Sequence, residues 1–217
     1  MPRASGRPAG RAALLSLFAL FALFSAVPVA ASWAQTGEPP LAPFAAQRVS
    51  VLPVQFLRGD TAAPVSQAQW AVVRSQLDDS IGTAIFERGV GNKWAYAADL
   101  ARLAKRNTGY VSDPATLGAG SLRNRALRAD DQAPTVLLNN LRPLIALGDS
   151  RYALIPIELA FAGKGPDMQA VLRLVLLDGR GGKLIWFADL TVPAASEFSS
   201  AQIGALAQRV ADLVAGR

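Results

Sequence analysis

The sequence predicts an α/β fold of the α+β type, in which about four helices pack on a mixed sheet of about four strands. A nearly continuous apolar segment occurs at residues 48–57, and apolar residues recur at helical intervals in four later segments. Three further apolar segments between residues 151 and 192 are joined by short links rich in Gly and Asp. Because a lone strand cannot pair its backbone groups, we expect the first segment to join the other three in one sheet.

The first predicted strand spans residues 48–57. Its apolar residues are nearly continuous, which is typical of a strand that is covered on both faces. Pro53 has no backbone N–H and removes one hydrogen bond from the strand. We therefore expect either an edge strand or a bulge at this position.

Four helices are predicted, at about residues 66–88, 94–106, 134–147 and 198–215, each with an apolar stripe. The first and the last begin with a Ser and a Gln at the spacing of a capping box, namely Ser66 with Gln69 and Ser199 with Gln202. Pro143 is expected to kink the third helix or to split off its last turn. The stretch of residues 109–133 is rich in turn formers, and only short structure is expected there.

Three strands are expected in the second half of the chain, at residues 151–161, 169–177 and 183–192. The links between them are short and contain glycine and aspartate, which predicts an antiparallel meander. The sheet should therefore consist of one N-terminal strand and a C-terminal three-strand meander. Residues 48–217 are expected to form a single domain.

The first 34 residues have the pattern of a secretory signal peptide. Arginines at positions 3, 7 and 11 precede an apolar stretch from Ala12 to Val27, and Pro28 and small residues follow. We expect cleavage after Ala34, then a Pro-rich linker over residues 35–47, and a periplasmic or secreted location for the rest. The alternative is an inner-membrane anchor through residues 12–31, which reach the ~20 residues that a membrane span requires.

The composition excludes several kinds of catalysis. The 217 residues contain no Cys and no His, which rules out disulfides, thiolate chemistry, zinc–sulfur sites, an N-terminal lipid on cysteine and a Ser-His-Asp triad. The glycine-rich stretches lack the spacing of a phosphate-binding loop. We expect no enzyme, no cofactor and no metal site. The net charge of +6 becomes +3 without the three arginines of the signal, which indicates no particular partner.

Glu158 is the strongest candidate for an unusual acid, because it lies inside an apolar strand. A buried carboxylate has a raised pKa and can act as an acid or a base. A simple hairpin, however, places Glu158 near Val171 and diagonal to Arg173, which favours a structural ion pair between Glu158 and Arg173. A carboxylate-based hydrolase would need two converging acids, and neighbours such as Asp78 and Asp79 point about 100° apart on a helix.

A contact surface is the other candidate site. Exposed aromatic side chains mark such surfaces, and we expect Trp94 and Phe187 to be exposed. The basic residues are either a solvated face or a site for anionic lipid headgroups or an acidic protein partner, whereas nucleic acid is not expected outside the cytoplasm. The candidate contact residues are Trp94, Arg102, Arg106, Arg123, Arg125, Arg128 and Phe187.

Several segments resemble those of a group of periplasmic α/β domains. The segments are 49–54, 148–155, 174–178 and 182–186. In these the chain resembles the group that comprises the TolB amino-terminal region, the curli secretion protein CsgG and the penicillin-binding-protein activator LpoB. The resemblance implies protein binding and assembly, and it supplies no site residues. The lipid-bearing cysteine of CsgG and LpoB is missing, and the curli pore hairpins are not evident.

These observations together favour an exported, non-catalytic binding or accessory component of a cell-envelope complex. A structural subunit of an oligomeric secretion or envelope assembly is the first alternative. A carboxylate-based hydrolase is the second.

Overall fold

The computed structural model describes residues 38–58, 64–123, 126–194 and 198–215. The chain divides into two units, residues 1–37 and residues 38–217. The predicted signal peptide, the alternative anchor at residues 12–31 and the first residues of the predicted linker lie outside the described residues.

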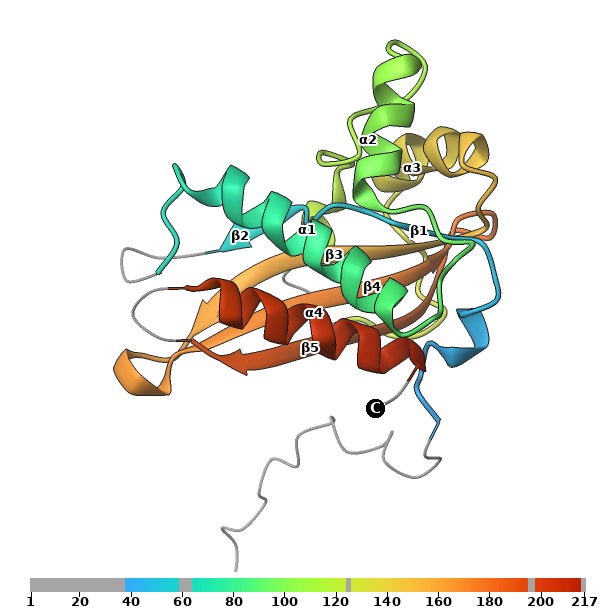
Figure 1. The fold of residues 1–217 in the computed structure, drawn as a ribbon. Helices are drawn as coiled ribbons and strands as arrows, with labels where there is room; N and C mark the ends of the chain where they lie inside the picture. Colours follow the sequence, from blue (N-terminus) through green and yellow to red (C-terminus); the bar gives the residue numbers. More distant parts are fainter. Residues whose placement is uncertain (1–37, 59–63, 124–125, 195–197, 216–217) are drawn as a thin grey trace, which may run out of the picture. The chain divides into compact units, whose positions relative to one another are not determined.

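The described residues contain five strands in one mixed sheet: β1 (Val49–Val51), β2 (Phe56–Arg58), β3 (Tyr152–Ala162), β4 (Gln169–Asp178) and β5 (Lys183–Pro193). Their order is β1-β3-β4-β5, and β2 also pairs with β3. β1 and β2 run parallel to β3, whereas β3, β4 and β5 form an antiparallel meander (Figure 1). The predicted fold class and the meander are confirmed.

The first predicted strand is divided in two around Pro53. Leu52 and Gln55 still donate their backbone N–H groups to carbonyls of β3, at 2.9 and 3.0 Å. Pro53 cannot donate, and the N–H of Val54 is bound by the carboxylate of Asp78 instead of by a strand. The segment lies at the edge of the sheet, which is one of the two expected arrangements, and the sheet has one strand more than expected.

Helices pack on both faces of this sheet (Figure 1). α1 (Trp70–Glu87) and α4 (Ser200–Ala215) lie side by side on one face, over a core that includes Leu77, Leu154 and Leu206. α2 (Ala97–Arg106) and α3 (Thr135–Leu147) pack on the other face, over a core that includes Leu141 and Ile155. Each of the four predicted helices is therefore present, and α3 continues through Pro143 to Leu147.

In both predicted capping boxes the Gln side chain accepts a hydrogen bond from the backbone N–H of the Ser. The backbone N–H of Ser66 donates to Gln69 Oε1 at 3.1 Å, and that of Ser199 donates to Gln202 Oε1 at 2.6 Å. α1 nevertheless begins only at Trp70, because residues 67–69 form a turn before it. The sequence pattern thus located the start of α1 to within one turn.

Residues 41–44, which we assigned to an extended linker, pack on the domain. Leu41 is 1% exposed, and its N–H donates to the carbonyl of Leu213 in α4 at 2.8 Å. Residues Ala42–Phe44 form a short 3-10 helix, η2. The packed part of the chain therefore starts before residue 48, because an apolar side chain ahead of the first strand finds a place in the core.

The stretch of residues 109–133 contains short structure, as predicted. Its 3-10 helix η3 (Ala119–Leu122) lies next to β3. Farther on, the N–H of Asp130 donates to the carbonyl of Leu184 at 2.8 Å, and that of Ala133 donates to the carbonyl of Gly182 at 2.8 Å. The end of this stretch thus covers the beginning of β5.

Candidate functional site

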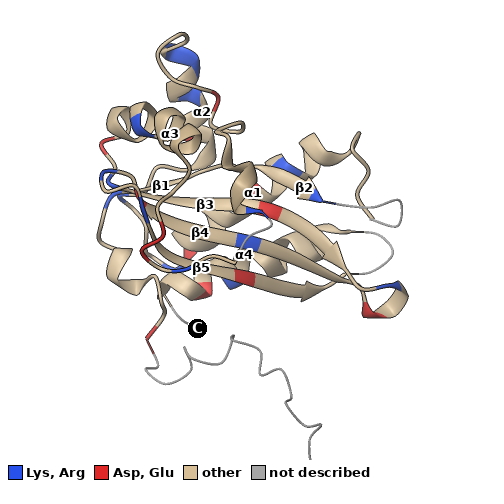
Figure 2. Cartoon of the chain, turned by 180° about the vertical axis from the view of Figure 1, so that it is seen from behind, with Lys and Arg blue, Asp and Glu red and all other residues tan. Residues whose placement is uncertain are grey.

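The sheet face that carries α2 and α3 is covered over only part of its area. The residues beneath the helices, such as Ile155 and Val175, are fully buried. Toward the other end of β3, β4 and β5, neither α2 nor α3 covers the same face (Figure 2), and of the described residues only the short helix η3 lies next to β3 there. We call this part the open sheet surface, and it comprises Arg58, Arg123, Glu158, Ala160, Val171, Arg173, Phe187, Asp189 and Thr191.

Glu158 is the buried centre of this surface. It is 2% exposed, and it lies where the register between β3 and β4 shifts after Pro156. Its Oε2 accepts hydrogen bonds from Arg58, with Nε at 2.8 Å, and its Oε1 accepts from Arg123, with Nε at 2.5 Å. Each carboxylate oxygen of Glu158 thus accepts hydrogen bonds from a guanidinium. This geometry gives the carboxylate a structural role and is unfavourable for proton transfer.

Arg173 has a different carboxylate partner. Its Nε and Nη2 donate to the two oxygens of Asp189, at 2.8 and 2.9 Å, and Asp189 stands directly opposite on β5. Its Nη1 donates to the backbone carbonyl of Arg123 at 2.6 Å. The pKa of Arg173 is raised, first by the hydrogen bond with Asp189 and further by the charges of Asp189 and Glu158, against an opposing effect of burial.

The predicted ion pair between Glu158 and Arg173 is thus replaced by two separate systems. The two residues are direct neighbours across β3 and β4 rather than diagonal ones, because the hairpin is longer than a simple turn and contains the short helix η4 (Gly165–Asp167). Glu158 nevertheless pairs with Arg58 and Arg123, while Arg173 pairs with Asp189. The physical reason is that β2 and η3 bring their arginines over Glu158, and β5 brings an acid beside Arg173.

Arg58 was missed by sequence reasoning. The tripeptide of residues 58–60 has the composition of a turn, and a turn explains those residues without any site. The structure instead places Arg58 at the end of β2, where Phe56 is the direct register partner of Glu158. The available signal was a basic residue at the end of an edge strand, but its partner depends on a parallel register that the sequence does not specify.

Trp94 is not part of a contact surface. It is 6% exposed, and its Nε1–H donates to the carbonyl of Phe44 at 3.2 Å. The expectation that Trp94 is exposed was therefore wrong, because the segment before α2 folds onto the edge of the sheet. There Ala95 exchanges backbone hydrogen bonds with Val49 and Val51 of β1, at 2.9 and 2.8 Å.

The other candidate contact residues are divided between elements. Arg102 and Arg106 are exposed on α2, where Arg102 pairs with Asp99, whereas Arg123 lies on the open sheet surface. Arg128 is exposed, and Arg125 lies outside the described residues. Phe187, at 37% exposed, lies on the open sheet surface as an aromatic side chain beside the ion pairs.

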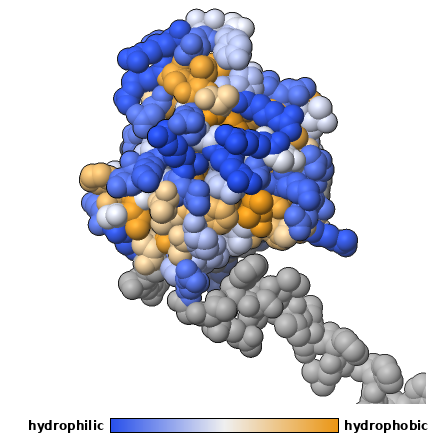
Figure 3. Space-filling model, turned by 90° about the vertical axis from the view of Figure 1, so that its right-hand side faces the viewer, coloured by the Kyte–Doolittle hydropathy of each residue, from blue (hydrophilic) through white to orange (hydrophobic). Residues whose placement is uncertain are grey.

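Exposed apolar side chains elsewhere on the described part of the chain are distributed over several elements. Figure 3 shows one face of the molecule, on which apolar residues occur in small groups between polar ones. Single exposed apolar residues are normal on a protein surface and need no partner. The large exposed apolar residues are Val72, Phe86, Tyr110, Val136, Leu147 and Phe187.

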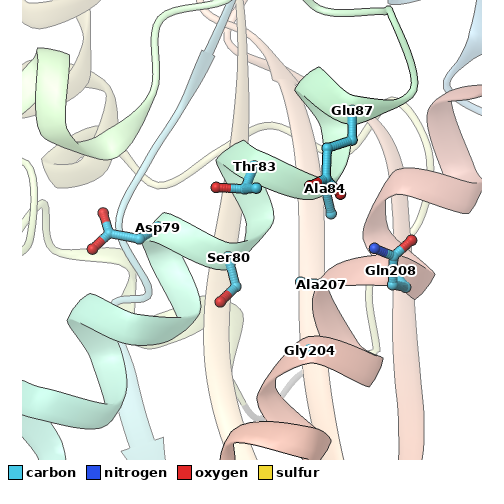
Figure 4. Close-up of a pocket in the computed structure, with 8 residues that line it drawn as sticks. All are labelled: Asp79, Ser80, Thr83, Ala84, Glu87, Gly204, Ala207 and Gln208. Carbon is cyan, nitrogen blue, oxygen red and sulfur yellow. The ribbon is translucent and has the colours of Figure 1, made fainter.

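An open groove of about 270 Å³ lies between α1 and α4. α1 contributes the polar side chains of Asp79, Thr83 and Glu87, and α4 contributes Gly204 and Gln208 (Figure 4). The side chain of Asp79 points away from α4 in this view. The groove therefore does not bring two acids toward a common centre.

Within the described ranges, no three residues of the types Asp and Glu are grouped so that they could hold a metal ion. Among the described helices, none combines the length and the apolar character needed to cross a membrane.

The fold and the site together define an α/β domain with a partly open sheet face that is lined by ion pairs. Three solved structures are similar to this chain. A PelC dodecamer from Paraburkholderia phytofirmans is 13% identical, and the match covers 79% of this chain and 89% of that chain with a TM-score of 0.36. The C-terminal domain of LpoB from Salmonella enterica is 14% identical, and the match covers 69% of this chain and 84% of that chain with a TM-score of 0.36. The lipoprotein GNA1162 from Neisseria meningitidis is 16% identical, and the match covers 76% of this chain and 94% of that chain with a TM-score of 0.37.

These similarities are general ones. LpoB, which is a member of the group that the sequence pattern resembles, is among these structures. No protein-family model matches the sequence, and no curated protein matches it.

Proposed function

We propose that this protein is an exported, non-catalytic accessory component of a cell-envelope complex, and that it acts by binding another protein. The observation that carries the proposal is the open sheet surface. There Glu158 holds two arginines in place, while their side chains stay 53% and 29% exposed at Arg58 and Arg123. Polar groups that are already fixed before binding lose little conformational freedom when a partner arrives.

Export is supported by the amino-terminal sequence. Three arginines, an apolar stretch and a series of small residues follow each other in the order that a signal peptide requires. A non-catalytic role is supported by the missing His and Cys, and by the neutralisation of Glu158 by two guanidiniums.

Photo-crosslinking in cells tests the proposal. A photoreactive amino acid at Val171 lies on the open sheet surface, and a second one at Tyr110 lies in the 109–133 stretch. Val72 is the matched control, because it is exposed on α1 on the opposite side of the sheet. We expect Val171 to capture an envelope protein that Val72 does not capture. The proposal is contradicted if neither Val171 nor Tyr110 captures a protein.

A structural subunit of an oligomeric assembly is the second candidate function, and the edge of β5 favours it. Described residues near positions 130–133 pair with the beginning of β5. Beyond Leu184, the outer edge of β5 has no backbone partner among the described residues. Such an edge can pair with another chain. Sedimentation of the purified protein separates the two functions, because a monomer at micromolar concentration contradicts the assembly subunit.

A further inference from the structure

We propose that the open sheet surface binds an acidic segment of a protein partner, with one carboxylate of that segment held between the guanidiniums of Arg58 and Arg123. This inference rests on the proposed function and names the chemistry of the partner. It is carried by the hydrogen bonds that the two arginines leave unused, by the charge balance of the surface and by the fixed position of Arg123.

The two arginines have unused donors. Each of them directs its Nε and Nη2 toward Glu158. A guanidinium has five N–H groups, and its Nη1 edge can bind a second carboxylate. Within the described part of the chain, Nη1 of Arg58 and Nη1 of Arg123 make no hydrogen bond. Both side chains are partly exposed.

The charge balance fits a single added carboxylate. Among the described residues of this surface, Arg58 and Arg123 share the one charge of Glu158, which leaves one positive charge, while Arg173 and Asp189 neutralise each other. The neighbouring side chains on this surface are short and uncharged, namely Ala160, Val171 and Thr191. A membrane of anionic lipids presents many charges and is bound by clusters of basic residues. A surface with one excess charge is better matched by one Asp or Glu side chain of a protein.

The position of Arg123 is fixed from three sides. Its guanidinium lies over the ring of Phe56, with 4.7 Å between the guanidinium carbon and the ring centroid. Its backbone carbonyl accepts a hydrogen bond from Arg173, and its side chain pairs with Glu158. A donor that is held in this way binds a carboxylate at low entropic cost. Phe187 lies on the same surface at β5, where it can contact an apolar residue of the same segment.

Fluorescence anisotropy with the purified protein tests this inference. The probe is a short fluorescein-labelled peptide with blocked ends that contains glutamate and leucine, and the reference probe has glutamine in place of each glutamate. We expect the glutamate peptide to bind at least about tenfold more tightly at physiological salt, and we expect Arg58→Met to remove this preference. Arg48→Met is the matched control, since Arg48 is an exposed arginine that pairs with Asp149 away from the open sheet surface.

A second variant separates binding from folding. Arg58→Lys keeps a positive charge beside Glu158 but lacks the second N–H edge, and it should lose the preference while it unfolds close to the wild-type temperature. A preference that persists in both Arg58 variants, or that Arg48→Met also removes, overturns the inference. Binding of phosphatidylglycerol vesicles that depends on Arg58, with no preference among the peptides, overturns it in favour of lipid. If Val171 still crosslinks an envelope protein in that case, the proposed function stands and only the partner chemistry is wrong.

Discussion

Asp78 on α1 accepts a 2.9 Å hydrogen bond from the backbone N–H of Val54, in the segment between β1 and β2. The N–H of Val54, which follows Pro53, has no strand partner, and the side chain of Asp78 on the helix accepts its hydrogen bond instead. The carboxyl group is largely shielded from water, and burial raises its pKa from 3.8 to about 7. The hydrogen bond from Val54 and the charge of Arg74 lower the pKa, and the charge of Asp79 raises it slightly.

The stability of the domain should therefore fall as the pH rises from about 4 to about 7. In this window the folded protein holds a proton on Asp78 that the unfolded chain has released, so each increase in pH favours unfolding. We expect a loss of about 1–2 kcal/mol, because the carboxyl is still partly exposed. Urea unfolding at several pH values measures it. Asp78→Asn should flatten the dependence of the free energy of unfolding on pH, and Asp79→Asn should not. Equal slopes in the wild type and in both variants would show that another group is responsible.

The ion pairs of the open sheet surface can be separated by double-mutant cycles. We expect Glu158→Gln and Arg123→Met to show a coupling free energy of about 1 kcal/mol or more, because these residues are in direct contact and Glu158 is buried. Glu158→Gln and Arg173→Met should be coupled by less than about 0.5 kcal/mol, because Arg173 pairs with Asp189. Chemical unfolding of the single and double variants gives both values. A larger coupling for the second pair would restore the cross-strand pairing predicted from the sequence.

Two helical glycines should respond differently to alanine. A Cβ at Gly204 of α4 would meet nothing within 4 Å, whereas a Cβ at Gly82 of α1 would lie 3.3 Å from Cδ1 of Tyr96. We expect Gly204→Ala to raise the free energy of unfolding by about 0.5–1 kcal/mol through helix propensity. Gly82→Ala should gain less or lose stability, since the Tyr96 ring must move. Thermal unfolding compares them, and an equal gain in both would mean that Tyr96 does not restrict α1.

Ser50 carries a buried hydroxyl in β1. Its Oγ is fully buried and has no hydrogen-bond partner among the described residues. We expect Ser50→Ala to leave the free energy of unfolding unchanged or to raise it by up to about 1 kcal/mol, because an unpaired buried polar group is costly. Ser150→Ala is the control, since its Oγ donates to the carbonyl of Gly148 at 3.3 Å, and it should lower stability slightly. A clear loss with Ser50→Ala would show that the hydroxyl is bound after all.

The export prediction can be checked on the mature protein. We expect its mass to correspond to a chain that begins at Gln35, because cleavage after Ala34 places small residues at the two positions that the peptidase requires. Ala34→Leu should leave the uncut precursor, while Trp33→Leu should be processed normally. Mass spectrometry of the exported protein decides this, and an intact wild-type chain in the membrane fraction would support the anchor at residues 12–31 instead.

Local sequence patterns predicted most of the fold. The meander of β3, β4 and β5 follows from alternating apolar segments with Gly- and Asp-rich links, and the helices follow from apolar stripes and capping residues. These features depend on interactions between residues close in the chain. Pro53 also predicted either an edge strand or a bulge, because a missing N–H is a local property.

The site was predictable only in part. Glu158 stood out as an acid in an apolar strand, and Arg123 and Phe187 were named as contact residues. The partner of Glu158 could not be found, because Arg58 is 100 residues away and reaches it only through the parallel register of β2 and β3. Trp94 was misplaced for the same reason, since its burial depends on a segment that joins the sheet edge through Ala95.

The sequence by itself determined the fold class, the order of the strands and helices along the chain, and the apolar stripe of each helix, because apolar periodicity and turn chemistry act over a few residues. Only the tertiary structure decided which charges meet: Glu158 with Arg58 and Arg123, Arg173 with Asp189, and Asp78 with the N–H of Val54. The physical reason is that such contacts join residues far apart in the chain, and a shift of one or two positions in strand register exchanges one partner for another.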